Sequence, residues 1–237
     1  MKRLGVDGCR GGWFAAWSDR GSWDFGLYAD FGLLWDAHRD AECILVDMPI
    51  GLARDAPRRA DVEVRKRLGP RRSSVFNCPV RAAVHAQDKA TAKALNRKAV
   101  GKSLSEQSLN IMKKIREIDL FLSSHPEAKD RLFESHPELC FAMAAGGPLA
   151  HPKRKAAGAA ERCEVLRRFV PGLGGLVDRV REAYPAARVA GDDVLDALML
   201  AVTAGGGGAA LRPVPDPVER DETGLPMAVW YREFDNA

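Results

Sequence analysis

Strand-like segments crowd the first 50 residues, and their order limits the folds that this chain can adopt. An apolar segment at 4–6 runs into a glycine-rich turn, a second follows at 13–17, and a third occupies 23–28. Short apolar segments separated by glycine turns predict an antiparallel hairpin extended by a third strand. Because these strands precede the first helical segment, at 31–38, the chain lacks the regular strand–helix alternation of a simple doubly wound sheet. The sequence therefore argues against that fold.

The remaining segments complete a mixed α/β order around a helical insertion. Residues 43–46 form a continuous apolar run, which is typical of a strand buried in the middle of a sheet. Residues 54–125 are predicted to be mainly helical, and a short strand returns at 131–133. We expect a single domain over 1–237, with the insertion at roughly 54–125 within it. Further helices are predicted over 137–143, 156–169, 173–183 and 192–204, with a last edge strand over 227–231.

The composition allows a sizeable hydrophobic core that needs no disulfide bond or structural metal. Apolar residues make up 46% of the chain and charged residues 29%, which excludes a wholly disordered protein. The five cysteines form no Cys-x-x-Cys pair, so neither a disulfide framework nor a structural zinc site is expected. The longest apolar runs, such as 194–204, are too short to cross a bilayer, and no signal-like segment follows Met1. We therefore expect a cytoplasmic protein with no membrane partner.

Four aspartates occupy positions at which a catalytic site could form. Asp7 follows the first strand at its glycine-rich turn, and Asp47 follows the buried central strand. Asp193 and Asp196 are three residues apart at the start of the apolar helix, so they share one helical face. Capping of the helix explains Asp192 or Asp193 well, and which of the two belongs to a site stays open. Asp196 lies among Val, Leu, Ala and Met residues, where an unpaired carboxylate is costly to bury.

A divalent cation shared by Asp7, Asp47 and Asp196 would remove that cost. Oxygen-only ligands suit Mg²⁺ or Mn²⁺ better than zinc. With Asp193 assisting, two such ions about 4 Å apart could clamp the attacking and leaving oxygens of a phosphodiester. Each aspartate taken singly could equally be structural, so the prediction rests on the four together.

Glu134 closes the returning strand and is a further candidate. His136, Pro137 and Glu138 follow it, and this segment fits an ordinary helix start, with proline in the first turn and glutamate favoured by the helix dipole. The same position fits a catalytic role, in which Glu134 is another metal ligand or a base that orients water. Both interpretations stay open.

Basic residues gather in the predicted insertion. The segment 54–72 holds eight Arg or Lys against three acidic residues, although the whole chain has a net charge of only +4. Such a cluster could track the phosphates of a nucleic acid, and a solvated helix face is the more common outcome. Arg81 could present its guanidinium to a phosphate or pair with a nearby carboxylate. The candidate substrate-binding residues are Arg81, Lys102, Lys113, Lys114 and Arg116.

Several segments together resemble an uncharacterised family of predicted nucleases, domain-of-unknown-function family 429. The matching segments are 5–13, 46–51, 74–76 with 79–81, 101–107, 114–119 and 134–138. The resemblance implies a ribonuclease-H-like α/β fold: a mixed sheet of three antiparallel strands followed by parallel strands, flanked by helices, with a helical insertion. Within that superfamily, 193–198 is similar to the C-terminal acidic helix of bacterial Holliday-junction resolvases. By this resemblance Asp7, Asp47, Asp193 and Asp196 are metal ligands, and Glu134 matches a motif without a settled role.

Residues and resemblance together predict a nuclease that uses Mg²⁺ or Mn²⁺ to hydrolyse nucleic-acid phosphodiesters. Asp7 would bridge two ions, and Asp47 and Asp196 would each complete one. The alternative is a catalytically inactive nucleic-acid-binding or regulatory module on the same fold. DNA versus RNA and endo- versus exonuclease action stay open, and the sequence is compatible with a homodimer without fixing the oligomeric state.

Other enzyme classes fit the chain less well. Asp7 and the glycines after it also resemble the first phosphate loop of actin-like and sugar kinases, but those proteins need two such domains. Lys102 follows a glycine as in a P-loop, yet Asn96 stands where the first glycine of that motif is required. A serine hydrolase is poorly supported, since no Gly-x-Ser-x-Gly occurs.

Overall fold

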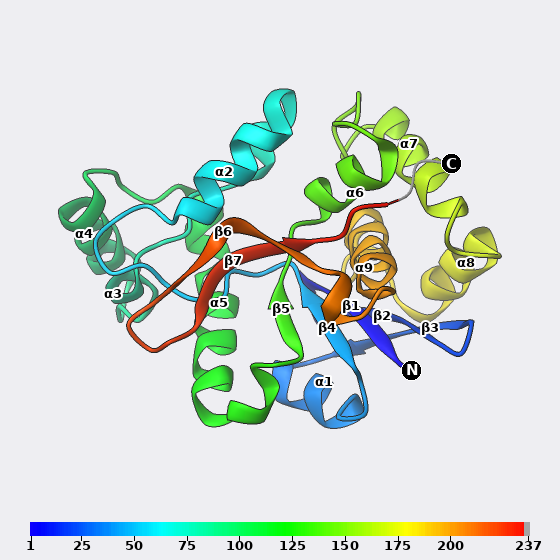
Figure 1. Ribbon diagram of the computed structural model, residues 1–237, viewed down its shortest axis with the longest axis horizontal. Coiled ribbons are helices and arrows are strands. Elements are labelled where there is room, and N and C mark those ends of the chain that lie inside the picture. The colour runs from blue at the N-terminus through cyan, green and yellow to red at the C-terminus, as the bar shows by residue number, and fades with distance from the viewer. Residues whose placement is uncertain (235–237) are drawn as a thin grey trace. The chain divides into compact units, whose positions relative to one another are not determined.

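The computed structural model describes residues 1–234 and contains a five-stranded mixed sheet. The antiparallel strands β1, β2 and β3 form one side of the sheet, and β4 and β5 continue it in parallel with β1 (Figure 1). The strand order is β3-β2-β1-β4-β5. Each of these five strands was predicted from the sequence. They span Arg3–Cys9 (β1), Gly12–Asp19 (β2), Ser22–Tyr28 (β3), Cys43–Val46 (β4) and Leu132–Glu134 (β5).

Two short turns let the first three strands fold back on one another. Gly12 has a φ of 127°, and a Cβ there would lie 2.0 Å from the carbonyl oxygen of Tyr28. Between β2 and β3, Arg20 and Gly21 have φ values of 49° and 86°. Two successive positive values are what a two-residue type I′ hairpin turn requires, and that turn matches the twist of the strands it joins. The meander therefore depends on positions with positive φ, of which Gly12 and Gly21 are glycines and Arg20 is not.

Helices cover both faces of this sheet (Figure 1). The ring of Phe31, in α1, meets Trp13 of β2 edge-on on one face, with 5.3 Å between the ring centroids. On the other face α9 lies across β1, β2 and β4, and α6 and α7 pack against α9. This arrangement of strands and helices is the ribonuclease-H-like α/β fold expected from the family resemblance. The helices are α1 (Phe31–Ala37), α6 (Pro137–Ala145), α7 (Ala156–Arg167), α8 (Leu173–Ala183) and α9 (Gly191–Ala204), followed by a 3₁₀ turn (Gly208–Ala210).

Gly5 lets α9 approach β1 more closely than any side chain would allow. A Cβ at this position would lie 2.0 Å from the backbone oxygen of Ala197 and 2.2 Å from the backbone nitrogen of Ala201. Asp7 follows Gly5 by two residues on the strand, so it projects from the same face, and Asp196 precedes Ala197 on the helix. The close approach therefore brings the two carboxylates together.

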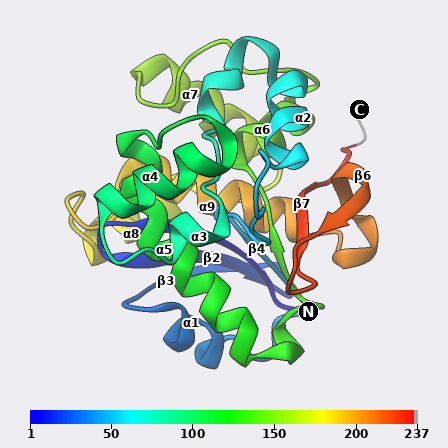
Figure 2. The same ribbon diagram turned by 90° about the vertical axis from the view of Figure 1, so that its left-hand side faces the viewer.

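A second compact unit consists of Met48–Lys129 and Pro213–Val229. Figure 2 shows α3, α4 and α5 gathered in this unit, and their core includes Ala83, Ala92 and Met112. The first unit holds the five-stranded sheet and comprises the described residues outside these two segments. Elements of the second unit are α2 (Arg59–Leu68), α3 (Arg81–Val84), α4 (Lys89–Val100) and α5 (Glu106–Ser124), 3₁₀ segments (Gly69–Ser74 and Pro126–Ala128), and most of β6 (Arg212–Arg220) and β7 (Pro226–Tyr231).

The C-terminal strands differ from the prediction. The segment predicted as a last edge strand lies in β7, but β7 pairs with β6 in a separate two-stranded sheet. The strand β6 is missing from the prediction because its prolines at 213, 215 and 217 lack backbone donors and normally interrupt strands. A sheet of two strands tolerates them because each strand has a free edge. The expectation of one domain stays a prediction, and the second unit extends beyond the expected insertion to include 213–229.

The helices are short or charged relative to the thickness of a membrane. Within residues 1–234, no helix combines enough length with enough apolar character to cross a bilayer. The apolar helix α9 has 14 residues, whereas a span needs about 20. The 19-residue α5 is longer but carries charged residues along its length.

Replacing Gly5 with alanine is expected to destabilise the protein strongly. The added methyl group would meet the backbone of α9, which cannot move aside as the tip of a flexible side chain could. We expect Gly5→Ala to lower the free energy of unfolding by about 3 kcal/mol or more, the upper end of overpacking costs. Urea unfolding followed by circular dichroism measures this change.

Gly175→Ala is the matched control. Gly175 lies in α8, and nothing stands within 4 Å of a Cβ added there. The substitution should raise stability by roughly 0.5–1 kcal/mol, because alanine is the better helix former. If Gly5→Ala unfolds at the urea concentration of the wild type, the close contact between α9 and β1 is wrong.

Candidate metal centre

The parallel pairing of β1 with β4 places Asp7 and Asp47 side by side. Val6 is paired with Val46 in the register of these strands, and the backbone N–H of Asp47 donates to the carbonyl oxygen of Val6 at 2.9 Å. Asp7 and Asp47 are the next residues along their strands. Since side chains alternate between the faces of a sheet, both project from the face that carries Gly5. That is the face covered by α9.

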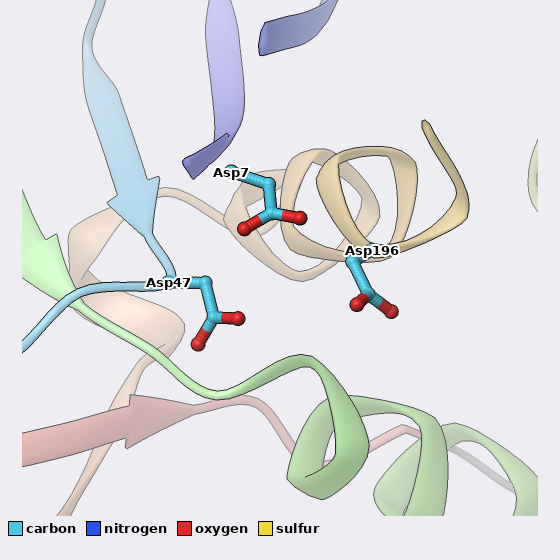
Figure 3. Close-up of side chains that lie close together, drawn as sticks. All are labelled: Asp7, Asp47 and Asp196. Carbon is cyan, nitrogen blue, oxygen red and sulfur yellow. The ribbon is translucent and has the colours of Figure 1, made fainter. Parts of the chain in front are cut away.

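The helix α9 supplies a third carboxylate. Asp196 lies in its second turn and is only 2% exposed. Figure 3 shows the side chains of Asp7, Asp47 and Asp196 directed toward one shared space between the ends of the strands and the helix. Each offers one carboxylate oxygen, and these oxygens all lie within 4.8 Å of one another. The structure therefore brings together three of the four aspartates predicted as metal ligands.

Burial and mutual repulsion make the ionised form of these carboxylates unfavourable. Burial raises the pKa of Asp7 well above its usual range, and the charges of Asp47 and Asp196 raise it further. Burial also raises the pKa of Asp47, and the nearby His136 offsets part of this rise. For Asp196, burial raises the pKa to about 6, although the ammonium of Lys153 lowers it. The negative charge of the three ionised carboxylates therefore exceeds the positive charge near them.

This donor set fits a hard divalent cation. All three ligand atoms are carboxylate oxygens, which Mg²⁺ and Mn²⁺ prefer and which suit zinc less well. A dication would replace the repulsion between the carboxylates with attraction, and it would satisfy oxygens that are expensive to bury. The identity of the metal stays a prediction, whereas the fit of the residues to such an ion is a property of the site.

Lys153 adds a positive charge that the sequence patterns did not indicate. It lies between α6 and α7, with its Nζ 2.5 Å from Oδ2 of Asp196 and 3.7 Å from Oδ2 of Asp192. Burial lowers the pKa of Lys153, but the nearby carboxylates, that of Asp196 above all, outweigh burial and raise it above its ordinary value. Lys153 is one of three consecutive basic residues before a helix, and nothing in their spacing distinguishes it from its neighbours.

Asp193 has a different partner from the other predicted ligands. Its Oδ2 accepts a hydrogen bond of 2.7 Å from the backbone N–H of Ala190, the N-cap of α9. This is the capping role that the sequence offered as the alternative. Asp192, the other aspartate of the first turn, lies near Lys153. Within the described residues, neither belongs to the group of three carboxylates.

Glu134 projects from the opposite face of the sheet. It is paired with Val46 in the parallel register of β4 and β5, so its side chain shares the face of Val46 and not that of Asp47. Ser135 follows in the row of Asp47, and its Oγ donates to the carbonyl oxygen of Trp230 at 2.6 Å. Glu134 lies outside the carboxylate group, and a role as ligand or base stays a prediction.

The residues after Glu134 form an ordinary helix start. Pro137 and Glu138 occupy the first turn of α6, and His136 is its N-cap. The carboxylate of Glu138 forms a buried ion pair with Arg162 of α7. Glu138 therefore ties two helices together.

Arg81 is bound within the second unit. Its guanidinium donates to Oδ2 of Asp119 at 2.7 Å and to Oδ2 of Asp221 at 2.5 Å. His85 Nε2 lies 2.8 Å from the same oxygen of Asp119, and Asp221 also accepts from the backbone N–H of Leu52 at 2.9 Å. Pairing with carboxylates was the alternative predicted for Arg81. A phosphate would have to compete with two buried carboxylates for this guanidinium.

The other candidate substrate-binding residues also belong to the second unit. Arg116 donates through Nε and Nη2 to the carbonyl oxygen of Val84, and through Nη2 to that of Ala86, so its guanidinium holds the end of α3 in place. The three candidate lysines differ in their exposure to solvent. Lys102 and Lys113 are exposed, and Lys114 is half-buried. Binding of a substrate by any of these residues stays a prediction.

Comparison with known families agrees with the motifs. The family described as "Protein of unknown function (DUF429)" matches residues 5–220. Because this match covers most of the chain, the protein belongs to the DUF429 family, and the resemblance inferred from its motifs is confirmed. No curated protein and no solved structure matches the chain. The family description assigns no activity, so function has to be argued from the site.

Divalent ions are expected to stabilise the wild-type protein through the three carboxylates. At an Mn²⁺ concentration of roughly 100 times Kd, binding to the folded state alone should add about 2.7 kcal/mol. Asp7→Asn should lose most of this gain. In EDTA, and at a pH high enough to ionise Asp7 despite its raised pKa, the same variant should be more stable than the wild type, because a neutral amide replaces a buried charge that lies beside like charges. Thermal unfolding in EDTA and in Mn²⁺ measures both effects.

Asp130→Asn serves as the control, because Asp130 is an exposed aspartate outside the group. Its unfolding should respond to Mn²⁺ as the wild type does. Equal stabilisation of wild type and Asp7→Asn by Mn²⁺ would show that the ion binds elsewhere.

Arg81→Met is expected to destabilise the second unit. Removal of the guanidinium leaves Asp119 and Asp221 buried without their main cation, and breaking a buried ion pair costs about 3–5 kcal/mol. Lys113→Met, on the exposed side of α5, should change stability by less than about 0.5 kcal/mol. Urea unfolding of both variants tests this, and equal midpoints would favour a ligand-binding Arg81 over a structural one.

Proposed function

We propose that this member of the DUF429 family is a nuclease that hydrolyses the phosphodiester bonds of nucleic acid with Mg²⁺ or Mn²⁺. The observation that carries the proposal is the meeting of three buried carboxylates from β1, β4 and α9 on a ribonuclease-H-like sheet. Asp7 lies within the central strand β1 and Asp47 directly follows the neighbouring strand β4, and together with the helical carboxylate they form an oxygen-only ligand set. A fold hosts many activities, so the proposal depends on this site and not on the fold alone.

Asp7, Asp47 and Asp196 would hold the ion. When bound, a divalent ion supplies Lewis acidity toward a phosphoryl oxygen and activates water at neutral pH. The protein contributes precision, because one ligand lies within a hydrogen-bonded strand, the second directly follows another strand and the third lies on a buried helix. Burial contributes strength, since charges interact more strongly where water is excluded.

Lysine side chains would attract the phosphates of the substrate. The ammonium of Lys153 lies at the carboxylate group, and Lys102 and Lys113 are exposed on the second unit. Each phosphate that such a residue neutralises releases counterions, so binding should weaken steeply with salt. DNA and RNA offer the same phosphates, and the substrate class proposed is nucleic acid in general.

The ligand set proposed is smaller than the one predicted from the sequence. Asp193 is left out because its carboxylate caps α9, and Glu134 because its side chain projects from the other face of the sheet. If two ions bind, Asp7 would be the shared ligand, with Asp47 and Asp196 each completing one. Asp196 would then have to exchange its contact with Lys153 for a contact with an ion.

The test is cleavage of end-labelled single-stranded, double-stranded and branched DNA, and of RNA, in Mg²⁺, Mn²⁺ or EDTA. We expect cleavage of at least one substrate with metal and none in EDTA. Asp47→Asn and Asp196→Asn should reduce the rate by more than the roughly 10–100-fold that loss of an outer-shell partner costs. Asp130→Asn, which changes an exposed aspartate, should cleave as the wild type does.

The inactive alternative makes a different prediction. A binding module would hold nucleic acid equally well with and without metal, and Asp47→Asn would leave that affinity unchanged. Metal-independent binding without cleavage of any substrate would therefore replace the nuclease proposal with a binding function. Cleavage that persists in both aspartate variants would contradict the proposed site directly.

A further inference from the structure

Lys153 is held against the carboxylate group by the loop that carries it. The carboxylate of Glu161, on α7, accepts hydrogen bonds from two successive backbone N–H groups, those of Ala150 at 2.7 Å and His151 at 2.9 Å. The buried guanidinium of Arg162 donates to the carbonyl oxygen of His151 at 3.2 Å. Bonds on both sides of the backbone fix the path of the loop just before Lys153.

A glycine allows this loop to lie directly on α7. A Cβ on Gly158 would be 2.0 Å from the carbonyl oxygen of Pro152, the residue before Lys153. The N–H of Lys155 donates to the same carbonyl oxygen at 3.0 Å, which closes a turn around Lys153. The position of the lysine is thus built into the fold. It differs from an exposed basic side chain that meets a carboxylate by chance.

The contact occupies one end of the carboxylate group. Nζ of Lys153 lies 2.5 Å from Oδ2 of Asp196, so the ammonium and the carboxylate are in direct charge-assisted contact. Asp7 and Asp47 have no comparable lysine or arginine contact among the ion pairs of the described residues. The ammonium therefore supplies a positive charge at the position where a second divalent ion would otherwise meet Asp196, and Asp192 lies 3.7 Å from the same Nζ.

We propose that Lys153 is a resident cation that takes the place of one metal ion, so that the substrate-free protein binds a single divalent ion at the three carboxylates, with Asp7 and Asp47 as its main ligands. Lys153 keeps Asp196 engaged, and a second ion binds only in competition with the ammonium. The inference rests on the proposed function to the extent that the site binds divalent ions. It alters the two-ion arrangement predicted from the sequence by making Lys153 the residue that sets the number of ions.

The test is a titration of the protein over residues 1–237 with Mn²⁺, in which free Mn²⁺ is followed by electron paramagnetic resonance. The wild type should bind one ion tightly. Lys153→Met removes the charge while keeping most of the side-chain volume, and it should bind two. The Kd of its second ion should be lower than that of any second ion of the wild type by about tenfold or more. This factor corresponds to the free energy of a hydrogen bond to a charged group, which the second ion no longer has to displace. Lys153→Arg keeps the charge and should bind one.

Lys155→Met is the matched control, since Lys155 is an exposed lysine two residues along the same loop. It removes the same charge from the loop and should still bind one ion. Thermal unfolding in EDTA establishes that each variant is folded, and Lys153→Arg supplies a second variant if Lys153→Met is unstable.

The outcomes separate this inference from the proposed function. Two tight ions in the wild type, or a single ion in both wild type and Lys153→Met, would overturn the role of Lys153 and leave the metal site in place. Absence of Mn²⁺ binding in every variant would overturn both. One ion in the wild type and two in Lys153→Met would support the inference even if no nucleic acid were cleaved, because the readout is binding alone.

Discussion

Three carboxylates buried next to one another are the costly feature that the first unit is arranged to hold. The ionised forms of Asp7, Asp47 and Asp196 repel one another where little water screens them, so the pKa of each is raised. Such a cluster is kept either by taking up protons, as the raised pKa values favour, or by positive charge that compensates it. Lys153 provides part of that charge, and the oxygen-only ligand set fits a divalent ion for the rest. The proposed chemistry follows from this need for positive charge.

The backbone of the sheet determines where the carboxylates stand. Parallel pairing sets Val6 of β1 level with Val46 of β4, which puts Asp7 beside Asp47. The missing side chain of Gly5 lets α9 approach β1, which brings Asp196 to the same place. The same alternation of faces directs Glu134 away from the group. A residue therefore belongs to the site only if it meets two conditions. It must lie at the right level along its strand, and its side chain must project from the face of the sheet that α9 covers.

Much of this arrangement could be predicted from the sequence because it depends on local signals. Glycine turns and apolar runs marked the strands, and Asp196 was conspicuous as a carboxylate inside an apolar helix. Lys153 could not be found in this way, since its role depends on a loop held by Glu161 and Arg162. The prolines of β6 made that strand unrecognisable in the sequence. For Arg81 the sequence left two partners open, a phosphate or a carboxylate, and the contacts with Asp119 and Asp221 favour the carboxylate. Local patterns predicted the elements, while contacts between distant segments determined the environment of the site.

Diffraction measured at the manganese absorption edge, from crystals of the wild-type protein soaked in Mn²⁺, would locate the bound ion. We expect one anomalous peak at the carboxylates of Asp7 and Asp47, with the ammonium of Lys153 still on Asp196. A peak elsewhere, or aspartate side chains that turn away from one another toward separate basic partners, would contradict this expectation.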